Sequence, residues 1–360
     1  MADSKPLITG NSIRTENRPH SIEYVDFAKG YAMLTVVLFH FFFGNIVFGN
    51  LLDKAVFFGG SGIHLYFFLS GFGLTLGRKV PPLEFYRRRF TKIFLPYMFF
   101  VSFAFVLGFF YRVSVVQGWW AYLSHLFLFK MFDKDLMASY GYQLWFMSTL
   151  IQFYLVFPLL LAVKEKLGSL RWLALATLVS LAYFGFVYAS RLNGNTAWVT
   201  HFPQFLWEFA LGMTLADVYR NKNFRFWDWS PGWYACLAVL GVGAMGYFTL
   251  TFGEGVRAFN DIPAFLGYAS LSILVFQFTR KYLPWLKNAF MKLGDVSFFL
   301  YLTHVLVVQV LMERLRANGW EPSVFHLLLY LPLALLVAIG FQYFYSKVAS
   351  SFNRKALQPN

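Results

Sequence analysis

The chain is a succession of long apolar runs separated by short polar segments. A helix that crosses a bilayer needs about 20 mostly apolar residues, and runs of that length recur along almost the whole sequence. They predict ten membrane-spanning helices, at residues 28–49, 58–77, 92–111, 141–163, 171–190, 201–219, 232–252, 260–279, 294–312 and 324–346. The predicted fold class is therefore an all-α polytopic membrane protein.

The polar segments leave room for one domain only. We expect a transmembrane domain at residues 23–350, a polar cytoplasmic segment at 1–22 and a short cytoplasmic tail at 351–360. One connection, residues 111–140, is longer than the others. Its GWWAYLSHLFLF run is too short to cross a membrane and carries paired tryptophans, which favour membrane interfaces. It predicts an interfacial or re-entrant piece on the outer side.

Basic residues mark one side of the predicted membrane. With a cytoplasmic N-terminus, 23 of the 31 Lys and Arg residues fall on the inside, as the positive-inside rule requires. Both termini are then cytoplasmic. The eight on the outside are Lys54, Arg112, Lys130, Lys134, Arg191, Arg257, Arg314 and Arg316.

Composition supports the membrane prediction and narrows the possible partners. The chain is 58% hydrophobic and 13% charged, with a mean hydropathy of +0.53, well outside the range of soluble proteins. A net charge of +14 would suit nucleic acid, but the basic residues are scattered among short loops, so we expect membrane lipid and no nucleic-acid partner. The start of the chain lacks the features of a signal peptide. We expect a multi-pass plasma-membrane protein, in the inner membrane of a prokaryote.

Cysteine usage excludes two kinds of site. Cys236 is the only cysteine, so there is no internal disulfide and no cysteine-based metal site, and we expect no metal.

The first predicted helix carries a line of polar residues on an apolar background. Lys29 and His40 are eleven positions apart, which leaves them about 20° from eclipsed and about 16 Å apart along the axis. Asp26 precedes Lys29 by three positions and can pair with it. An ionisable residue inside a membrane is a functional candidate by default. The alternatives are a lysine that extends to the headgroups and a neutral histidine bound to a neighbouring helix.

The second predicted helix, GGSGIHLYFFLSGFGLTLG, is rich in small residues. Ser70-Gly71-Phe72 resembles a turn-like break, while tight helix packing is the simpler explanation of the glycines. His64 lies near the outer end of this helix, where it is either functional or merely solvated.

The densest cationic cluster follows on the inside, after Pro81 and Pro82. Such a cluster is usually a topology anchor or a contact for anionic lipid. It could also hold the phosphates of a cytosolic substrate, since guanidinium groups bind phosphate oxygens in pairs. Its members are Arg87, Arg88, Arg89 and Lys92.

The ninth predicted helix carries Ser297, Tyr301 and His304 at spacings of four and three, so these side chains share one face. They form either a polar seam between helices or a wall of a site. Glu208, His125 and His201 are weaker candidates.

Taken in order, these motifs resemble those of the membrane acyltransferase family 3. The resemblance runs from about Asp26 to Val307. The motifs that carry it are Asp26-x2-Lys29-x10-His40, GxxLYFFLSGF, RRRFTKIFLPY, Leu144-Trp145-Phe146, Phe209-Ala210-Leu211-Gly212-Met213 and LGDVSFFLYLTHVLV from Leu293.

The resemblance implies an integral membrane enzyme that moves an acyl group, here expected to be acetyl, from acyl-coenzyme A to a hydroxyl of a sugar, glycan, glycolipid or other small acceptor. The family's basic-x10-His motif maps onto Lys29 and His40, and its arginine motif onto Arg89 and Lys92, where lysine replaces the second arginine. His64 replaces the family's acid in the second-helix motif.

The expected site follows from this mapping. His40, Lys29 and Asp26 are the predicted catalytic residues, and Arg87, Arg88, Arg89 and Lys92 the predicted donor-binding residues. His40 would act either as a general base or through a covalent acyl-histidine. The predicted walls of the site are Ser70, Trp145, Ser297, Tyr301, His304 and His64.

Two other classes compete with this interpretation. A secondary transporter or export protein would also carry ionisable residues within the membrane, but the chain shows no inverted repeat and no paired broken helices. A lipid-binding scaffold would explain the basic inner loops but not a histidine buried opposite them.

Overall fold

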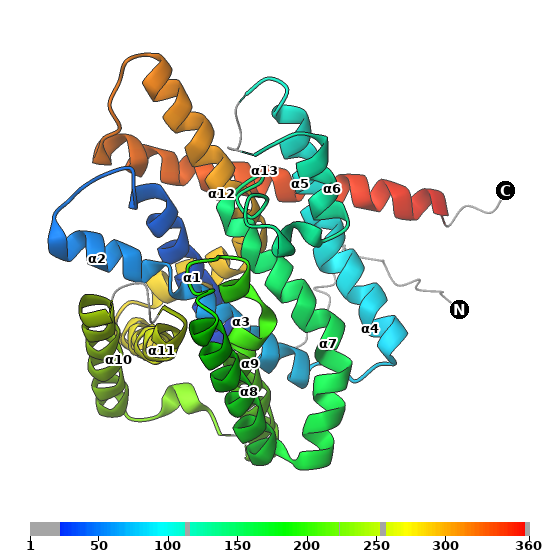
Figure 1. The fold of residues 1–360 in the computed structure, drawn as a ribbon, viewed down its shortest axis with the longest axis vertical. Helices are drawn as coiled ribbons and strands as arrows, with labels where there is room; N and C mark the ends of the chain where they lie inside the picture. Colours follow the sequence, from blue (N-terminus) through cyan, green and yellow to red (C-terminus); the bar gives the residue numbers. More distant parts are fainter. Residues whose placement is uncertain (1–21, 112–115, 223, 253–256, 357–360) are drawn as a thin grey trace, which may run out of the picture.

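The computed structural model describes residues 22–111, 116–222, 224–252 and 257–356, and all regular structure in these ranges is helical (Figure 1). The α-helices are α1 (Glu23–Phe42), α2 (Asn50–Gly59), α3 (Gly62–Leu76), α4 (Pro82–Arg89), α5 (Leu95–Leu107), α6 (Trp119–Leu126), α7 (Trp145–Leu167), α8 (Ser169–Ala189), α9 (Leu206–Lys222), α10 (Pro231–Phe252), α11 (Arg257–Tyr282), α12 (Pro284–Ala317) and α13 (Val324–Ala356). Shorter turns are the π-helix η1 (Phe90–Phe94) and the 3₁₀ helices η2 (Phe129–Phe132), η3 (Tyr142–Leu144), η4 (Trp198–Thr200), η5 (Phe202–Phe205) and η6 (Phe226–Asp228).

The described part contains nine helical stretches that are long and apolar enough to cross a membrane. They confirm a polytopic membrane protein and correspond to nine of the ten predicted spans. The tenth prediction, 201–219, coincides with η5 and the 17-residue α9. Helix α9 is short for a membrane crossing and is not among the nine stretches. The predicted N-terminal segment lies outside the described residues apart from Ile22, and α13 runs to Ala356, beyond the predicted end of the domain.

The first helix ends earlier than its apolar pattern predicts. The pattern continues to Gly49, whereas α1 stops at Phe42. Gly44 adopts a positive φ of 77°, and the Asn45 side chain donates to the carbonyl of Phe41, so the helix is terminated by local geometry that hydrophobicity does not reveal. His40 therefore lies in the last turn of α1, and a separate helix, α2, follows.

Two further expectations are corrected. Residues Ser70 to Phe72 form no break, because α3 is continuous from Gly62 to Leu76. The third predicted span begins at residue 92, but helical structure starts earlier: α4 begins at Pro82, and the chain continues through the π-helical η1 into α5. Proline is well suited to the first turn of a helix, where its missing N–H costs nothing.

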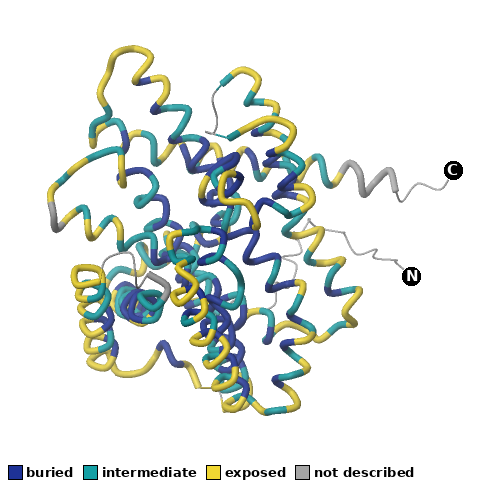
Figure 2. The backbone as a smooth tube through the Cα atoms, viewed as in Figure 1, coloured by how far each residue is buried: buried dark blue, intermediate teal, exposed yellow. Residues whose placement is uncertain are grey.

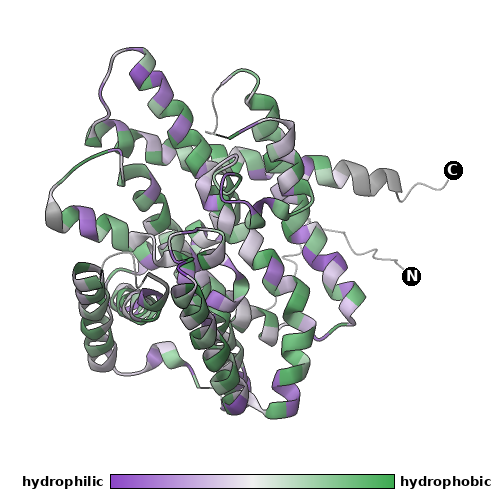
Figure 3. Ribbon diagram, in the orientation of Figure 1, coloured by the Kyte–Doolittle hydropathy of each residue, from purple (hydrophilic) through white to green (hydrophobic). Residues whose placement is uncertain are grey.

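Burial separates the inner helices from the outer ones. Buried residues gather at the centre, on α1, α3, α7, α9 and α12, while α8 and α10 expose most of their surface (Figure 2). The exposed surface of these outer helices is apolar (Figure 3), with Leu178, Val239 and Leu240 each more than 60% exposed. An apolar exterior of this kind is what a lipid environment requires.

Helices α1 and α12 pack closely through two glycines. A Cβ atom on Gly30 would collide with the carbonyl of Phe290, and one on Gly294 with the carbonyl of Asp26. Contacts between small residues allow helix backbones to approach each other closely. Because Gly30 faces Gly294 and His40 faces His304, the two helices run parallel. In the predicted ten-span topology, α1 and α12 are the first and the ninth spans, so they cross the membrane in the same direction. The parallel packing agrees with this topology.

A second glycine contact joins α3 to α9. Cβ atoms on Gly71 and Gly212 would collide with the carbonyls of Phe209 and Phe68, respectively. This contact brings His64 of α3 beside Glu208 of α9, so it fixes a polar pair in the same way that the first contact fixes the two histidines. Tight packing is thus the confirmed explanation for these glycines.

We expect Gly294→Ala to lower stability by about 1–3 kcal/mol, the usual cost of overpacking, and to reduce activity by moving His304. The matched control is Gly243→Ala on the exposed face of α10, where a Cβ would meet no atom within 4 Å. Thermal unfolding of both purified variants in detergent measures the difference. Equal midpoints for the two variants would show that the α1–α12 contact tolerates separation.

Membrane sidedness is tested by two matched lysine positions. With Cys236 replaced by serine, we expect Lys79→Cys to react with an impermeant thiol reagent only from the cytoplasmic side, and Lys134→Cys only from the opposite side. Both positions are exposed, so access depends on the membrane alone. The reverse pattern would invert the predicted topology.

Candidate active site

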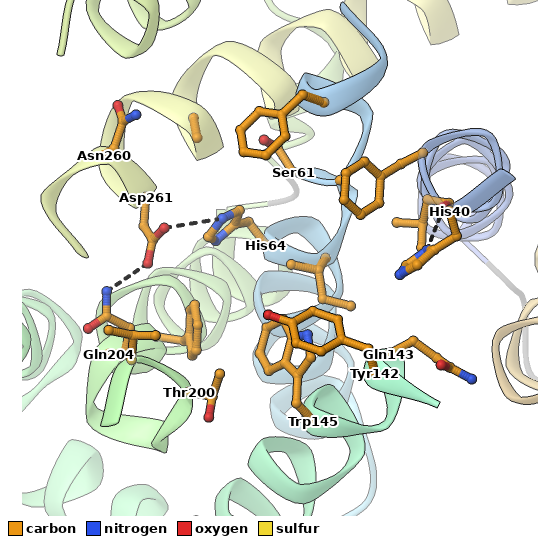
Figure 4. A pocket seen from close by; sticks show the side chains of 18 of the residues that line it. His40, Ser61, His64, Tyr142, Gln143, Trp145, Thr200, Gln204, Asn260 and Asp261 are labelled. Atoms are coloured by element: carbon orange, nitrogen blue, oxygen red, sulfur yellow. Dashed lines mark hydrogen bonds and ion pairs between the residues drawn. The ribbon is translucent and has the colours of Figure 1, made fainter. Parts of the chain in front are cut away.

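A cavity of about 190 Å³ lies among the ends of several helices (Figure 4). The cavity is bordered by the last turn of α1, the start of α3, the η3–α7 junction and the start of α11. In the predicted topology, all of these are outer ends. The polar residues that line the cavity are His40, Ser61, His64, Tyr142, Gln143, Trp145, Thr200, Gln204, Asn260, Asp261 and Tyr301.

His40 lines one side of this cavity and contacts His304, a predicted wall residue that is fully buried and does not line the cavity itself. His40 Nδ1 lies 2.9 Å from the Val36 carbonyl oxygen, and His304 Nδ1 lies 2.8 Å from the Leu300 carbonyl oxygen. A carbonyl accepts only, so each Nδ1 carries a proton and each neutral ring keeps a lone pair on Nε2. The Nε2 atom of His304 lies 3.3 Å from His40 Nδ1, within reach of the same N–H. His40 Nε2 is then left as a basic nitrogen.

The opposite side of the cavity is also polar. His64 Nδ1 lies 2.8 Å from Glu208 Oε1, and its Nε2 lies 3.6 Å from Asp261 Oδ1. Gln204 Nε2 donates to Asp261 Oδ2 at 2.7 Å. Glu208 is completely buried and reaches the cavity only through His64.

The other predicted wall residues divide into two groups. Trp145 and Tyr301 line the cavity, and the Tyr301 hydroxyl donates to the carbonyl of Gln143 at 2.7 Å. Ser297 and Ser70 do not line it. Ser297 donates to the carbonyl of Gly294 within its own helix, and Ser70 contacts the hydroxyl of Tyr154. Ser297 and Tyr301 share one face of α12, but only Tyr301 lines the cavity.

The inner end of α1 carries a separate cationic site. Lys29 Nζ lies 3.1 Å from Asp26 Oδ1, as the spacing predicts. Lys92 is close enough to both Lys29 and Arg89 for their charges to interact. The Arg89 guanidinium lies over the rings of Phe85 and Tyr154, at 5.5 and 5.7 Å from their centroids. Within the described part of the chain, its buried Nε has no hydrogen-bond partner.

Arg87 and Arg88 behave differently from Arg89. Both are exposed, and their Nε atoms bind the two oxygens of Glu84 at 3.0 and 2.7 Å. The structure thus divides a cluster that looks uniform in the sequence. Arg89 is partly buried within charge range of Lys92, while Arg87 and Arg88 stay on the surface and are already paired with a carboxylate.

The weaker candidates have different roles. His125 is buried away from the cavity, where Tyr97 Oη binds its Nδ1 at 2.6 Å and Ser139 Oγ its Nε2 at 2.8 Å. Burial and the nearby Lys130 charge hold the pKa of His125 well below its usual range. His201 is likewise absent from the cavity lining. In the described ranges, no group of three or more His, Cys, Asp and Glu side chains could hold a metal ion.

Sequence reasoning missed Gln204 and Asp261 and gave Glu208 little weight. Glu208 had a usable signal, since a carboxylate inside an apolar run needs a partner. Gln204 and Asp261 lie at the edges of predicted spans, where polar residues are ordinary, so nothing in the sequence distinguished them.

A protein-family model described as an acyltransferase domain matches residues 22–343. The matched region contains every residue of the cavity and of the inner cationic site. Comparisons with curated proteins and with solved structures find no match.

Proposed function

The chain belongs to acyltransferase family 3, and on this premise we propose that it moves an acetyl or similar acyl group from acyl-coenzyme A to a hydroxyl of a carbohydrate or glycolipid acceptor. Membership in the family establishes a membrane acyltransferase. The donor, the acyl group and the acceptor are parts of the proposal, and they rest on the two polar sites at the ends of α1.

The inner cationic site suits the phosphates of coenzyme A. Lys29, Arg89 and Lys92 gather three positive charges near one another, with Asp26 as the carboxylate paired to Lys29. Guanidinium and ammonium groups bind phosphate oxygens strongly when partly removed from water. His40 lies eleven residues beyond Lys29, about 16 Å along the helix. That separation suits a donor whose thioester is at the end of a long flexible arm.

The observation that carries the proposal is that Nε2 of His40 has no hydrogen-bond partner in the ranges that the structure describes. Its Nδ1–H is committed to the Val36 carbonyl, and the ring lines the cavity (Figure 4). As the acceptor oxygen attacks the thioester carbonyl, Nε2 takes the hydroxyl proton. The carbon–sulfur bond then breaks, and the proton passes to the departing thiolate. The products are an ester and coenzyme A, so one base accounts for all the protons.

His304 would assist His40 in the manner of the third group in a catalytic triad. When Nε2 of His40 is protonated, Nδ1–H becomes a stronger donor, and the lone pair on His304 Nε2 lies 3.3 Å away. The role of His304 is to position and stabilise the charged ring, because its only proton, on Nδ1, is bound to the Leu300 carbonyl.

We expect His304→Asn to lower kcat about tenfold with little change in the donor KM. Asparagine can keep the bond that Nδ1 makes to Leu300 but removes the atom that faces His40. His304→Gln is the matched variant, because its longer side chain can return an acceptor oxygen to that place, and it should recover part of the rate. Equal rates for wild type and His304→Asn would remove His304 from the mechanism.

The cavity opens among helix ends on the predicted outer side, while the cationic site lies at the inner end of α1. This arrangement supports a donor that enters from the cytoplasm and an acceptor that enters from the other side. It gives each substrate its own approach to His40.

The test is thiol release by the purified protein supplied with acetyl-coenzyme A. We expect free coenzyme A to appear slowly with water alone and faster when sugars are added. A transporter or a lipid-binding scaffold would release no thiol under either condition. Labelled acetyl groups retained on the protein without acceptor would indicate an acyl-histidine instead of direct transfer.

A further inference from the structure

The cavity wall opposite His40 carries polar groups that the transfer step does not need. His40 alone can take the hydroxyl proton and return it to the thiolate. Nevertheless, His64, Gln204 and Asp261 line the same cavity from three different elements, and Figure 4 shows them as a connected group. Polar groups in this position can bind the acceptor.

His64 is held from behind by Glu208. The 2.8 Å contact between Nδ1 and Oε1 contains one proton, which resides on either atom. In both cases Nε2 is the nitrogen that remains for the cavity. The glycine contact between α3 and α9 fixes the two backbones, so the ring has little freedom to turn.

The separation between His64 and Asp261 suits a hydroxyl that bridges the two side chains from one side. Nε2 and Oδ1 are 3.6 Å apart, longer than the roughly 2.7–3.2 Å of a direct hydrogen bond. A hydroxyl group both donates and accepts. Placed beside these two atoms, it would donate to the carboxylate and form a second bond with the imidazole in either protonation state. Gln204 binds the other oxygen, Oδ2, and so keeps Oδ1 on the His64 side.

An aromatic surface lies near the polar groups. Trp145 and Phe205 both line the cavity and stack with centroids 5.8 Å apart at an angle of 29°. Binding sites commonly combine an apolar surface with a few well-placed polar groups that set orientation. A ring that carries hydroxyls at its edge matches this combination.

We propose that His64 and Asp261 bind a second hydroxyl of the acceptor while His40 acts on the first. The cavity then selects ring compounds with several hydroxyls over mono-alcohols of the same size. This inference rests on the proposed function in one respect only, that the cavity is the acceptor site.

The test measures occupancy of the cavity without any acyl donor. Ser61 lines the cavity, so Ser61→Cys, in a chain whose Cys236 is replaced by serine, reports access to a thiol reagent. The probes are inositol and cyclohexanol, which share a six-membered carbon ring and differ in having six hydroxyls or one. We expect inositol to slow labelling at concentrations where cyclohexanol has no effect.

His64→Asn is the diagnostic variant, because it can keep a bond to Glu208 while losing the atom that faces the cavity. We expect it to need about ten times more inositol for the same protection, the effect of losing one good hydrogen bond. His326→Asn is the control, since His326 binds Ser323 and is absent from the cavity lining. Asp261→Asn should repeat the loss if His64→Asn does not fold.

Three results would overturn the proposal. They are equal protection by both probes, protection by neither, and unchanged inositol protection in both His64→Asn and Asp261→Asn. No acyl group is transferred in this experiment. A protein that binds inositol as expected but releases no thiol from acetyl-coenzyme A would refute the proposed reaction and leave the subsite standing.

Discussion

Replacement of His40 with alanine is expected to reduce acyl transfer by a factor of about 10²–10⁴, the usual contribution of a general base. Alanine has no atom at the position of Nε2, and the neighbouring Nε2 of His304 faces the other nitrogen of the removed ring, Nδ1. Folding should survive, because His40 is only partly buried and, among the described residues, its contact with His304 is the one hydrogen bond that it forms with another helix. Thiol release from acetyl-coenzyme A with added acceptor measures the loss.

His326→Ala is the control for the loss of an imidazole as such. It removes a ring bound to Ser323 at the start of α13, outside the cavity, and should retain transfer. Thermal unfolding of both variants separates a lost base from a lost fold. Turnover near that of wild type in a folded His40→Ala protein would exclude His40 as the base.

The second large effect is expected at Arg89 and should appear in donor binding. Arg89→Gln removes a guanidinium group that lies close to Lys92 and has a buried, unpartnered Nε in the described structure. Hydrogen bonds to charged groups contribute about 1.5–3 kcal/mol, so the KM for acetyl-coenzyme A should rise about 10- to 100-fold. If Arg89 binds phosphate equally in the ground and transition states, kcat will change little.

Arg87→Gln is the matched comparison, two residues away in the same cluster. Its guanidinium is exposed and already bound to Glu84, and surface pairs of this kind contribute about 0–1 kcal/mol. The donor KM should therefore stay within about fivefold of wild type. If the whole cluster were only a topology anchor, both variants would lower the yield of inserted protein and leave the KM unchanged.

The sequence was most informative where function depends on a single helix. The alignment of Asp26, Lys29 and His40 follows from helical periodicity, and the structure contains the Lys29–Asp26 pair that the spacing predicts. Nine of the spans follow from apolar length alone. The end of α1 could not be read in this way, because Gly44 and Asn45 stop the helix inside an apolar run.

The pairs that build the site were beyond the reach of periodicity. His40 and His304 are 264 residues apart, and His64 and Glu208 are 144 apart. Each pair depends on a glycine contact between helices that are distant in the chain. A glycine in the sequence does not indicate which helix it will contact. For the same reason, Ser297 and His304 share a helix face but only His304 meets His40.

The basic cluster is another arrangement that the sequence did not predict. Four cations within six residues looked equivalent in the sequence. Their separation into an inward group and a surface group depends on Glu84, which binds Arg87 and Arg88, and on the π turn that follows Arg89. Local pairing of this kind is decided by side-chain geometry, which composition does not contain.

The most direct test of the acyl-transfer proposal is an experimental structure of the His40→Ala protein with acetyl-coenzyme A, in which turnover is blocked but the donor site is intact. The proposal predicts phosphate oxygens within hydrogen-bonding distance of Arg89 and Lys92, with the thioester carbonyl beside position 40 and facing the cavity. A donor bound elsewhere, or one whose thioester lies outside the cavity that His40 and His64 line, would contradict it.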